Sequence, residues 1–123
     1  MRTAERGQST VELAMIIPVV VLLILLCVQT ALVLRDRLLV VHAARAAARA
    51  VIVEPNQRAA EAVLLRQGAP ISSATVTVSG GTSGGSLATV TVRLRATQVP
   101  IVGRVVASTV LQERLVVMVE GAS

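Results

Sequence analysis

The chain contains no lysine, no phenylalanine, no tyrosine and no tryptophan, and it has a single cysteine, Cys27. Without lysine it can form neither a Walker-type phosphate loop nor a Schiff base. Without aromatic rings it cannot stack nucleic-acid bases, and its arginines are scattered from Arg2 to Arg114 rather than clustered. One cysteine excludes a disulfide within the chain; Cys27 is expected to act as a small apolar residue, with a disulfide between two copies as the alternative. The composition therefore argues against nucleic-acid binding and against several classes of enzyme.

Charge is also missing from one long stretch, Leu13 to Leu34. As a helix, these residues would measure roughly 33 Å at 1.5 Å per residue, and the hydrocarbon core of a bilayer is about 30 Å thick. The stretch is therefore expected to cross a membrane. Pro18 predicts a mild kink, which membrane helices tolerate.

The helix is expected to continue beyond this stretch, because residues 38–53 are rich in alanine and contain neither glycine nor proline. One helix from about Thr10 to about Val53 is predicted, and Pro55 ends it. The alanines suit close packing against another helix. Helical spacing puts two sets of residues on different sides: Leu38, Val41, Arg45 and Ala48 on one, and Arg35, His42 and Arg49 on another.

The remaining residues predict a small domain of mixed structure. Asn56 is a good N-cap for a short helix that ends near Gly68, with an inner stripe of Ala60, Val63, Leu64 and Gln67. Residues 73–79 and 88–96 alternate strictly and predict two half-buried strands, joined by a flexible loop at 80–85. Their predicted inward residues are Ala74, Val76, Val78, Ala88, Val90, Val92, Leu94 and Ala96.

The last part of the chain alternates less clearly. Residues 99–103 predict a crossover or an apolar loop, and residues 111–120 predict a third strand covered on both sides, with a helix as the alternative. The fold class is therefore α+β: a long N-terminal transmembrane helix that continues into a stem, then a short helix and a small antiparallel sheet of two or three strands.

Catalytic groups are few. His42 has no second histidine or cysteine near it in the sequence, and no Ser-His-Asp arrangement is indicated. The glycine-rich loop at 80–85 lacks the lysine and the following helix of a phosphate loop. We therefore expect no enzyme activity, no cofactor, no bound metal and no small-molecule substrate.

The segment Gly7-Gln8-Ser9-Thr10-Val11-Glu12 places a carboxylate directly before the apolar stretch, five residues after a glycine. A carboxylate at the edge of a membrane helix is costly unless something pairs with it. Residues 6–14, the apolar stretch with Pro18, and the alanine-rich residues 43–50 together resemble TadE-like proteins, minor pseudopilins of the tight-adherence (Tad or Flp) pilus system. The resemblance covers about the first fifty residues and leaves the sister TadF-like subfamily open. Leu13 departs from it, because these proteins often carry an aromatic residue there.

The resemblance implies that a prepilin peptidase cleaves between Gly7 and Gln8. Glu12 would then be the fifth residue of the mature chain and would pair with the N-terminal amine of a neighbouring subunit during assembly. The implied organisation, a pilin-like layout, is a leader peptide at 1–7, a transmembrane helix at 8–34, a helical stem at 35–54 and an extracytoplasmic α+β domain at 55–123. The implied location is the bacterial cytoplasmic membrane, crossed once, and the implied partners are the peptidase, other pilin-like subunits and the pilus assembly machinery.

Two alternatives stay open. The chain is either a pseudopilin or an unprocessed single-pass membrane protein whose small domain binds a partner; a secreted domain released by signal peptidase ranks last, since the apolar stretch is longer than a usual signal core. The arginines that follow the span, Arg35, Arg37, Arg45 and Arg49, favour a cytoplasmic C-terminal domain by the positive-inside rule. The resemblance implies the opposite orientation, with the domain outside, and that is the orientation we expect.

Overall fold

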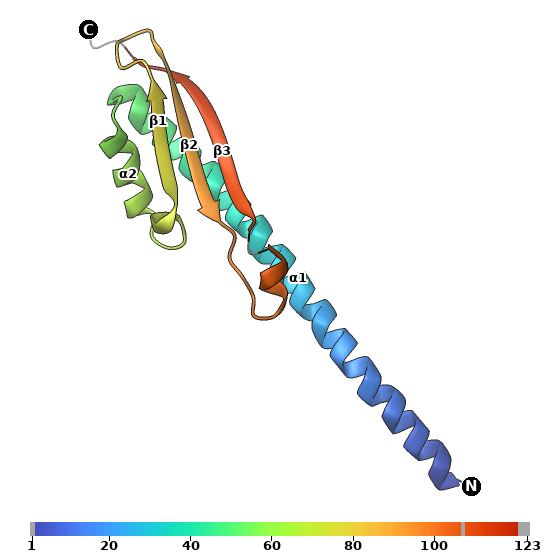
Figure 1. Ribbon diagram of the computed structural model, residues 1–123. Coiled ribbons are helices and arrows are strands. Elements are labelled where there is room, and N and C mark those ends of the chain that lie inside the picture. The colour runs from blue at the N-terminus through green and yellow to red at the C-terminus, as the bar shows by residue number, and fades with distance from the viewer. Residues whose placement is uncertain (1, 107, 121–123) are drawn as a thin grey trace.

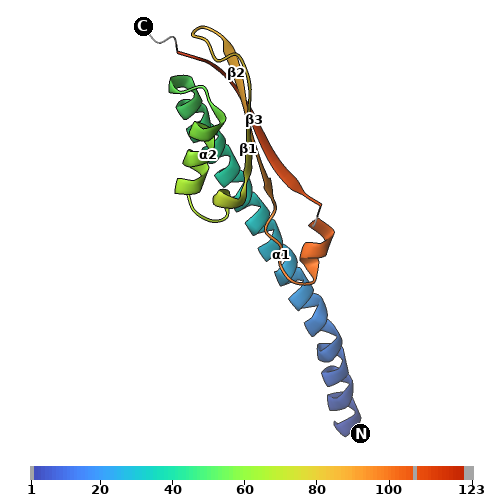
Figure 2. The ribbon, with the colours of Figure 1, turned by 60° about the vertical axis from the view of Figure 1, so that its left-hand side comes forward.

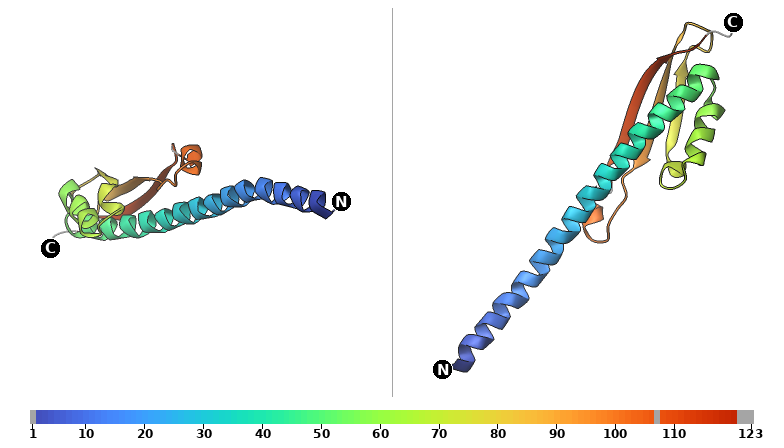
Figure 3. Two further views of the ribbon diagram at one scale, coloured as in Figure 1. Left: turned by 90° about the horizontal axis from the view of Figure 1, so that it is seen from below. Right: turned by 180° about the vertical axis from the view of Figure 1, so that it is seen from behind.

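A single helix, α1, runs from Arg2 to Val53 and forms the long axis of the molecule (Figure 1). Its 52 residues correspond to about 78 Å at 1.5 Å per residue. The structure is a computed structural model that describes residues 2–106 and 108–120. One end of α1 projects freely, and the rest of the chain forms a small head around the other end (Figure 1). The free end bends gently within the N-terminal third of α1, the part that contains Pro18 (Figure 3, left).

The head consists of a short helix and a three-stranded sheet. Helix α2 is Gln57–Arg66, and the strands are β1 at Thr75–Gly80, β2 at Leu87–Arg95 and β3 at Val110–Met118. Two short 3-10 segments, η1 at Ile71–Ser73 and η2 at Val102–Val106, lie in the connections. The strands are antiparallel in the order β1-β2-β3, so the segment at 99–103 lies in a loop between neighbouring strands and is not a crossover. The predicted α+β fold class and the third strand are confirmed.

The hydrophobic core lies between one face of the sheet and the two helices. The stem of α1 (residues 35–53) and α2 both cover this face, whereas the opposite face of the sheet is bare (Figure 2). The core residues are small or branched: Val40, Ala43, Ala44, Ala47, Ala48, Val51, Ala60, Leu64, Ile71, Val76, Ala88, Val90, Val92, Leu94 and Val119. Alanine side chains on the stem allow α2 and the sheet to approach the helix axis closely.

Several local predictions are confirmed. Asn56 caps α2, because its side-chain oxygen accepts a hydrogen bond from the backbone N–H of Ala59 at 2.7 Å. In β2 the five predicted inward residues, from Ala88 to Ala96, are all buried. The side chain of Gln57 bonds the backbone of β1 twice, accepting from the N–H of Val78 and donating to the C=O of Val76. Helix α2 thereby protects that edge of the sheet.

Four details of the sequence analysis are wrong. Helix α1 begins at Arg2 rather than near Thr10, because nothing in the preceding residues stops a helix. The buried stripe of the stem runs through Asp36, Val40, Ala43 and Ala47, whereas Leu38 and Arg45, predicted to share a side with buried Ala48, are exposed. Gln67 is the C-cap of α2 and is exposed, so it is not part of the inner stripe.

The fourth concerns β3, which is covered on one face only. Its inward residues are half-buried against the stem, and three apolar residues on its other face are at least half exposed: Val110, Val116 and Met118. The alternation of apolar and polar residues in β3 is therefore poorer because apolar residues also lie on its uncovered face.

Candidate functional site

The three residues predicted to act in processing and assembly, Gly7, Gln8 and Glu12, lie in the free end of α1. We call residues 6–28 of α1 the arm. All three residues are exposed, and no other element that the structure describes lies beside them (Figure 1). The described part of the head therefore offers them no partner.

Gly7 has no structural role within the chain. It lies in helical backbone, and a Cβ atom added at this position would meet nothing within 4 Å. Glycine in a helix interior costs about 1 kcal/mol relative to alanine. Nearby, the Thr10 hydroxyl donates to the C=O of Arg6 at 2.8 Å, a local bond that slightly weakens a helix. Both features weaken the first turns of α1, and packing does not explain the glycine.

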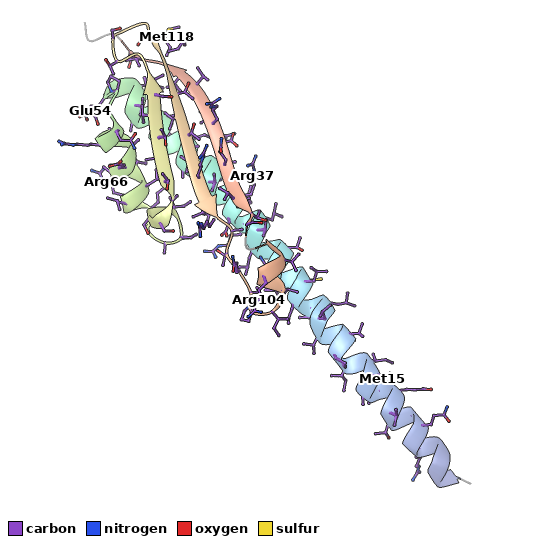
Figure 4. The ribbon with its side chains drawn as sticks, viewed as in Figure 1. Met15, Arg37, Glu54, Arg66, Arg104 and Met118 are labelled. Atoms are coloured by element: carbon purple, nitrogen blue, oxygen red, sulfur yellow. The ribbon has the colours of Figure 1, made fainter. Side chains whose placement is uncertain are left out.

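The arm is apolar on all sides. Apart from the half-buried Leu25, its large apolar side chains from Val11 to Val28 are 44–71% exposed, and Figure 4 shows one of them, Met15, projecting from the bare helix. Among the residues that the structure describes, α1 is the helix long and apolar enough to cross a membrane. A helix that is apolar all round and unburied in its own chain is typical of a membrane span. The arm therefore supports single-pass anchoring in a membrane.

The other residues singled out in the sequence do not gather into a site. Cys27 is exposed on the arm and His42 is exposed on the stem, far from each other along α1. Among the side chains that the structure describes, no three His, Cys, Asp or Glu residues come together as a metal site would require.

A polar cluster that the sequence analysis missed joins α1 to the chain after β2. We call Gln29, Asp36, Thr97 and Val99 the clasp. The Gln29 amide donates to the C=O of Thr97 at 2.8 Å and accepts from the N–H of Val99 at 2.7 Å. Asp36 accepts from the N–H of Thr97 at 2.7 Å. Gln29 and Asp36 are 3% and 0% exposed, so these bonds are shielded from water and hold the base of the head on α1.

The clasp had a signal in the sequence. Gln29 is the last residue of Leu13–Leu34 with a side-chain amide, and Asp36 follows it by seven residues, which is two helical turns. Both therefore lie on the stripe that continues as Val40, Ala43 and Ala47. Polar residues aligned with an apolar stripe indicate buried hydrogen bonds. Their partners, the backbone groups of residues 97 and 99, carry no side-chain signature.

Beside the clasp, Arg37 connects α1 to β3 on the surface. Its guanidinium lies 3.3 Å from the Glu113 carboxylate and donates to the C=O of Gln112 at 2.8 Å (Figure 4). The clasp and Arg37 together fix the head at the point where the uncharged stretch ends.

Comparison with known proteins agrees with the features of the arm and stem. Residues 7–49 match the family model of TadE-like proteins, beginning at the glycine and ending within the alanine-rich stem. The resemblance seen in the sequence is thereby confirmed over these residues, and it suggests involvement in the Tad pilus system. No curated protein and no solved structure matches the chain significantly.

Proposed function

Because residues 7–49 match the family model of TadE-like proteins, we propose that this chain is a minor pseudopilin. In this proposal a prepilin peptidase cleaves the chain after Gly7, and the mature protein takes part in assembly of a Tad pilus. The observation that carries the proposal is the exposed arm, where Gly7 and Glu12 have no role in folding the chain that bears them. In this role the protein is a structural component, without catalysis, cofactor or small-molecule substrate. Adhesion and secretion are the processes that such a pilus would serve.

Electrostatics supports a partner for Glu12. The carboxylate directly precedes the uncharged stretch, at the edge of the proposed span, where an unpaired charge is costly. Cleavage after Gly7 creates a positive amine on Gln8, four residues or about 6 Å from Glu12 along the helix. An amine from a neighbouring subunit would lower the desolvation cost of the carboxylate and would set the axial register between subunits.

The distribution of free surface on α1 supports assembly through the arm. The alanine stripe of the stem is occupied by the head of the same chain, so it is closed to another helix. The arm is open on every side. Contacts with other pilin-like helices would therefore fall on residues 8–28, next to Glu12.

The first test is the intact mass of the protein from native membranes, with and without the host's prepilin peptidase. We expect the mass to fall by residues 1–7 only when the peptidase is present. A full-length chain in both samples would contradict processing. It would favour the second candidate, an unprocessed membrane anchor with a partner-binding head, which the unbroken helix from Arg2 through Gly7 supports.

The second test concerns Glu12. We expect Glu12→Ala and Glu12→Gln to block incorporation into pili while membrane insertion and cleavage continue, because the axial pairing is lost. Glu5→Gln is the matched control, since it removes a carboxylate from the leader and should leave piliation unchanged. Normal piliation in a Glu12→Ala strain without other copies of the protein would contradict the assembly role.

Orientation needs its own test, because the arginines after the span favour the opposite topology. A periplasm-dependent reporter fused after Ser123 is expected to be active, and a cytoplasm-dependent one inactive. The reverse result would overturn both the orientation and the pseudopilin role.

A further inference from the structure

The chain between β2 and β3 extends below the sheet and lies along α1, on the side of the arm (Figures 1 and 2). We call residues 97–106 the basal loop. Its start is held by Gln29 through the two backbone bonds of the clasp. Gln29 precedes Leu34, the end of the uncharged stretch, by five residues, or about 7–8 Å along the helix. The basal loop thus lies at a height where α1 is still uncharged and apolar.

The surface of the basal loop includes two strongly exposed large apolar residues, although loops are usually polar. Ile101 is 73% exposed and Val105 is 84% exposed, the largest exposed fraction among the large apolar side chains of the described residues. The loop's other side is closed: Gly103 is buried, and a Cβ atom there would lie 2.7 Å from the Cβ of Gln98. The loop therefore packs on Gly103 and presents Ile101 and Val105 outward.

The backbone of Ile101 adds a second, independent anomaly. Its φ is +74°, the left-handed region that β-branched residues rarely adopt and that glycine adopts freely. Glycine would relieve this strain and would also remove an exposed apolar side chain. Among the residues that the structure describes, neither the backbone nor the packing accounts for an isoleucine here.

We propose that the basal loop is a second membrane contact of this protein, in which Ile101 and Val105 insert into the interfacial layer of the bilayer that α1 spans. We assign this contact to lipid because the loop is continuous with the exposed apolar surface of the arm and lies beside the end of the uncharged stretch of α1. Gln29, which holds the start of the loop, lies about 7–8 Å inside the end of the uncharged stretch, within the roughly 5–10 Å to which apolar faces of interfacial segments enter a bilayer. The proposal rests on α1 spanning a membrane and not on cleavage or pilus assembly.

The charges around the loop agree with lipid headgroups as its surroundings. Arg104 is exposed between the two apolar residues, and Figure 4 shows it at the lower end of the head. Arg93 and Arg95 are exposed at the end of β2 that leads into the loop. Arginines at this level would contact lipid phosphates, and they are attracted to anionic bilayers.

An apolar groove lies at the same height between α1 and the start of β3. It has a volume of about 460 Å³, and its walls are Leu26, Val33, Leu34 and Leu111 together with Gln29, Thr30 and Arg37. Apolar surface therefore surrounds α1 at this level on more than one side, as expected for a segment in contact with acyl chains.

The test uses the full chain reconstituted into vesicles, with an environment-sensitive fluorophore on one cysteine at a time. The native Cys27 reports insertion of α1. In a Cys27→Ser background, Val105→Cys reports the basal loop, and Thr82→Cys in the exposed hairpin loop at the far end of the sheet is the control. We expect aqueous iodide to quench the probe at 82 strongly and the probes at 27 and 105 weakly, with spin-labelled lipids showing the reverse order.

Strong iodide quenching at 105 overturns the proposal, whether or not the probe at 27 is shielded. If 27 alone is shielded, the span holds and the second contact is wrong; if neither is shielded, α1 does not insert and the membrane premise of the proposed function also fails. Shielding at 105 that disappears when the protein is diluted in lipid would identify a second copy as the occupant and would likewise overturn the proposal.

Substitutions at the loop separate lipid contact from folding. Ile101→Gly relieves the left-handed strain, so we expect the head to stay folded while the probe at 105 becomes more accessible to iodide. Arg104→Gln should remove the difference in shielding between vesicles with and without anionic phosphatidylglycerol. Unchanged shielding at 105 in the Ile101→Gly variant would show that Ile101 does not hold the loop in the bilayer.

Discussion

The arm and the stem are two parts of one helix with opposite surroundings. Both are mostly apolar, yet nearly all of the arm's large apolar side chains are 44–71% exposed, whereas Val40, Ala43, Ala44 and Ala47 of the stem are fully buried. The arm carries large branched residues on every side. The stem carries small residues on one stripe and arginines, such as Arg45 and Arg49, on the other side. Apolar content therefore does not distinguish a lipid-facing helix from a core helix, whereas residue size and the position of charge do.

The different surroundings of the arm and the stem also predict different functions for them. The stem uses its surface to fold the head, so substitutions there should act on stability. The arm contributes nothing to the core, so substitutions there should act on insertion and assembly. Three predictions test this separation, in order of decreasing effect.

The largest effect should come from placing the same carboxylate in each part. Val40→Asp puts a charge among the core residues and should destabilise the head by about 3–5 kcal/mol, the usual effect of an uncompensated buried charge. Leu23→Asp puts the carboxylate in the exposed arm and should make the free energy of membrane insertion less favourable by about 2.5–3.5 kcal/mol, without unfolding the head. Protease resistance of the head and the membrane-bound fraction measure the two effects separately.

Each variant is the control of the other. A head that becomes protease-sensitive in Leu23→Asp would show that the arm supports the fold. Normal protease resistance in Val40→Asp would show that the stem's stripe is not part of the core.

A smaller effect is expected from adding volume at matched alanines. Ala47 of the stem is fully buried, and Ala14 of the arm is exposed. Ala47→Leu overfills the core and should lower the free energy of unfolding by about 1–3 kcal/mol, whereas Ala14→Leu should leave it unchanged. Denaturant unfolding in detergent micelles, followed by circular dichroism, measures both, and equal effects at the two positions would contradict the separation.

The smallest effect should come from the boundary between the two parts. Arg37 pairs with Glu113, but their side chains are 47% and 25% exposed, so solvent screens the interaction. We expect Arg37→Met to lower the free energy of unfolding of the head by less than about 1 kcal/mol, and by less still at high salt. A larger loss would mean that this ion pair, and not the clasp, holds the base of the head.

Much of the fold could be predicted because its signals are local. Asn56 caps α2 through a residue three positions away, Pro55 ends α1 close to the expected residue, and the alternation of β2 reports its buried face directly. The motif from Gly7 to Glu12 is also local, and it carried the family resemblance that the comparison confirmed.

The parts that could not be predicted depend on distant residues. Gln29 and Asp36 bond backbone groups more than sixty positions later, and backbone groups have no sequence signal. The bare face of β3 depends on which side of the sheet the stem and α2 occupy. The exposed basal loop depends on the clasp, which fixes its height on α1. Cleavage at Gly7 and the pairing of Glu12 with another subunit stay predictions, because each involves a second protein and the structure is of one chain.

The covering of the stem by the last strand has a consequence for the order in which the protein is made. The stem's stripe ends at Val51, but β3, which helps to cover it, ends at Met118. At about 5–20 residues per second, a ribosome needs roughly 3–13 s to synthesise the chain between them. The arm is complete well before then and needs no later residue. Membrane insertion can therefore precede folding of the head. During that interval the alanine face of the stem stays uncovered, because the strands that pack on it have not yet been translated.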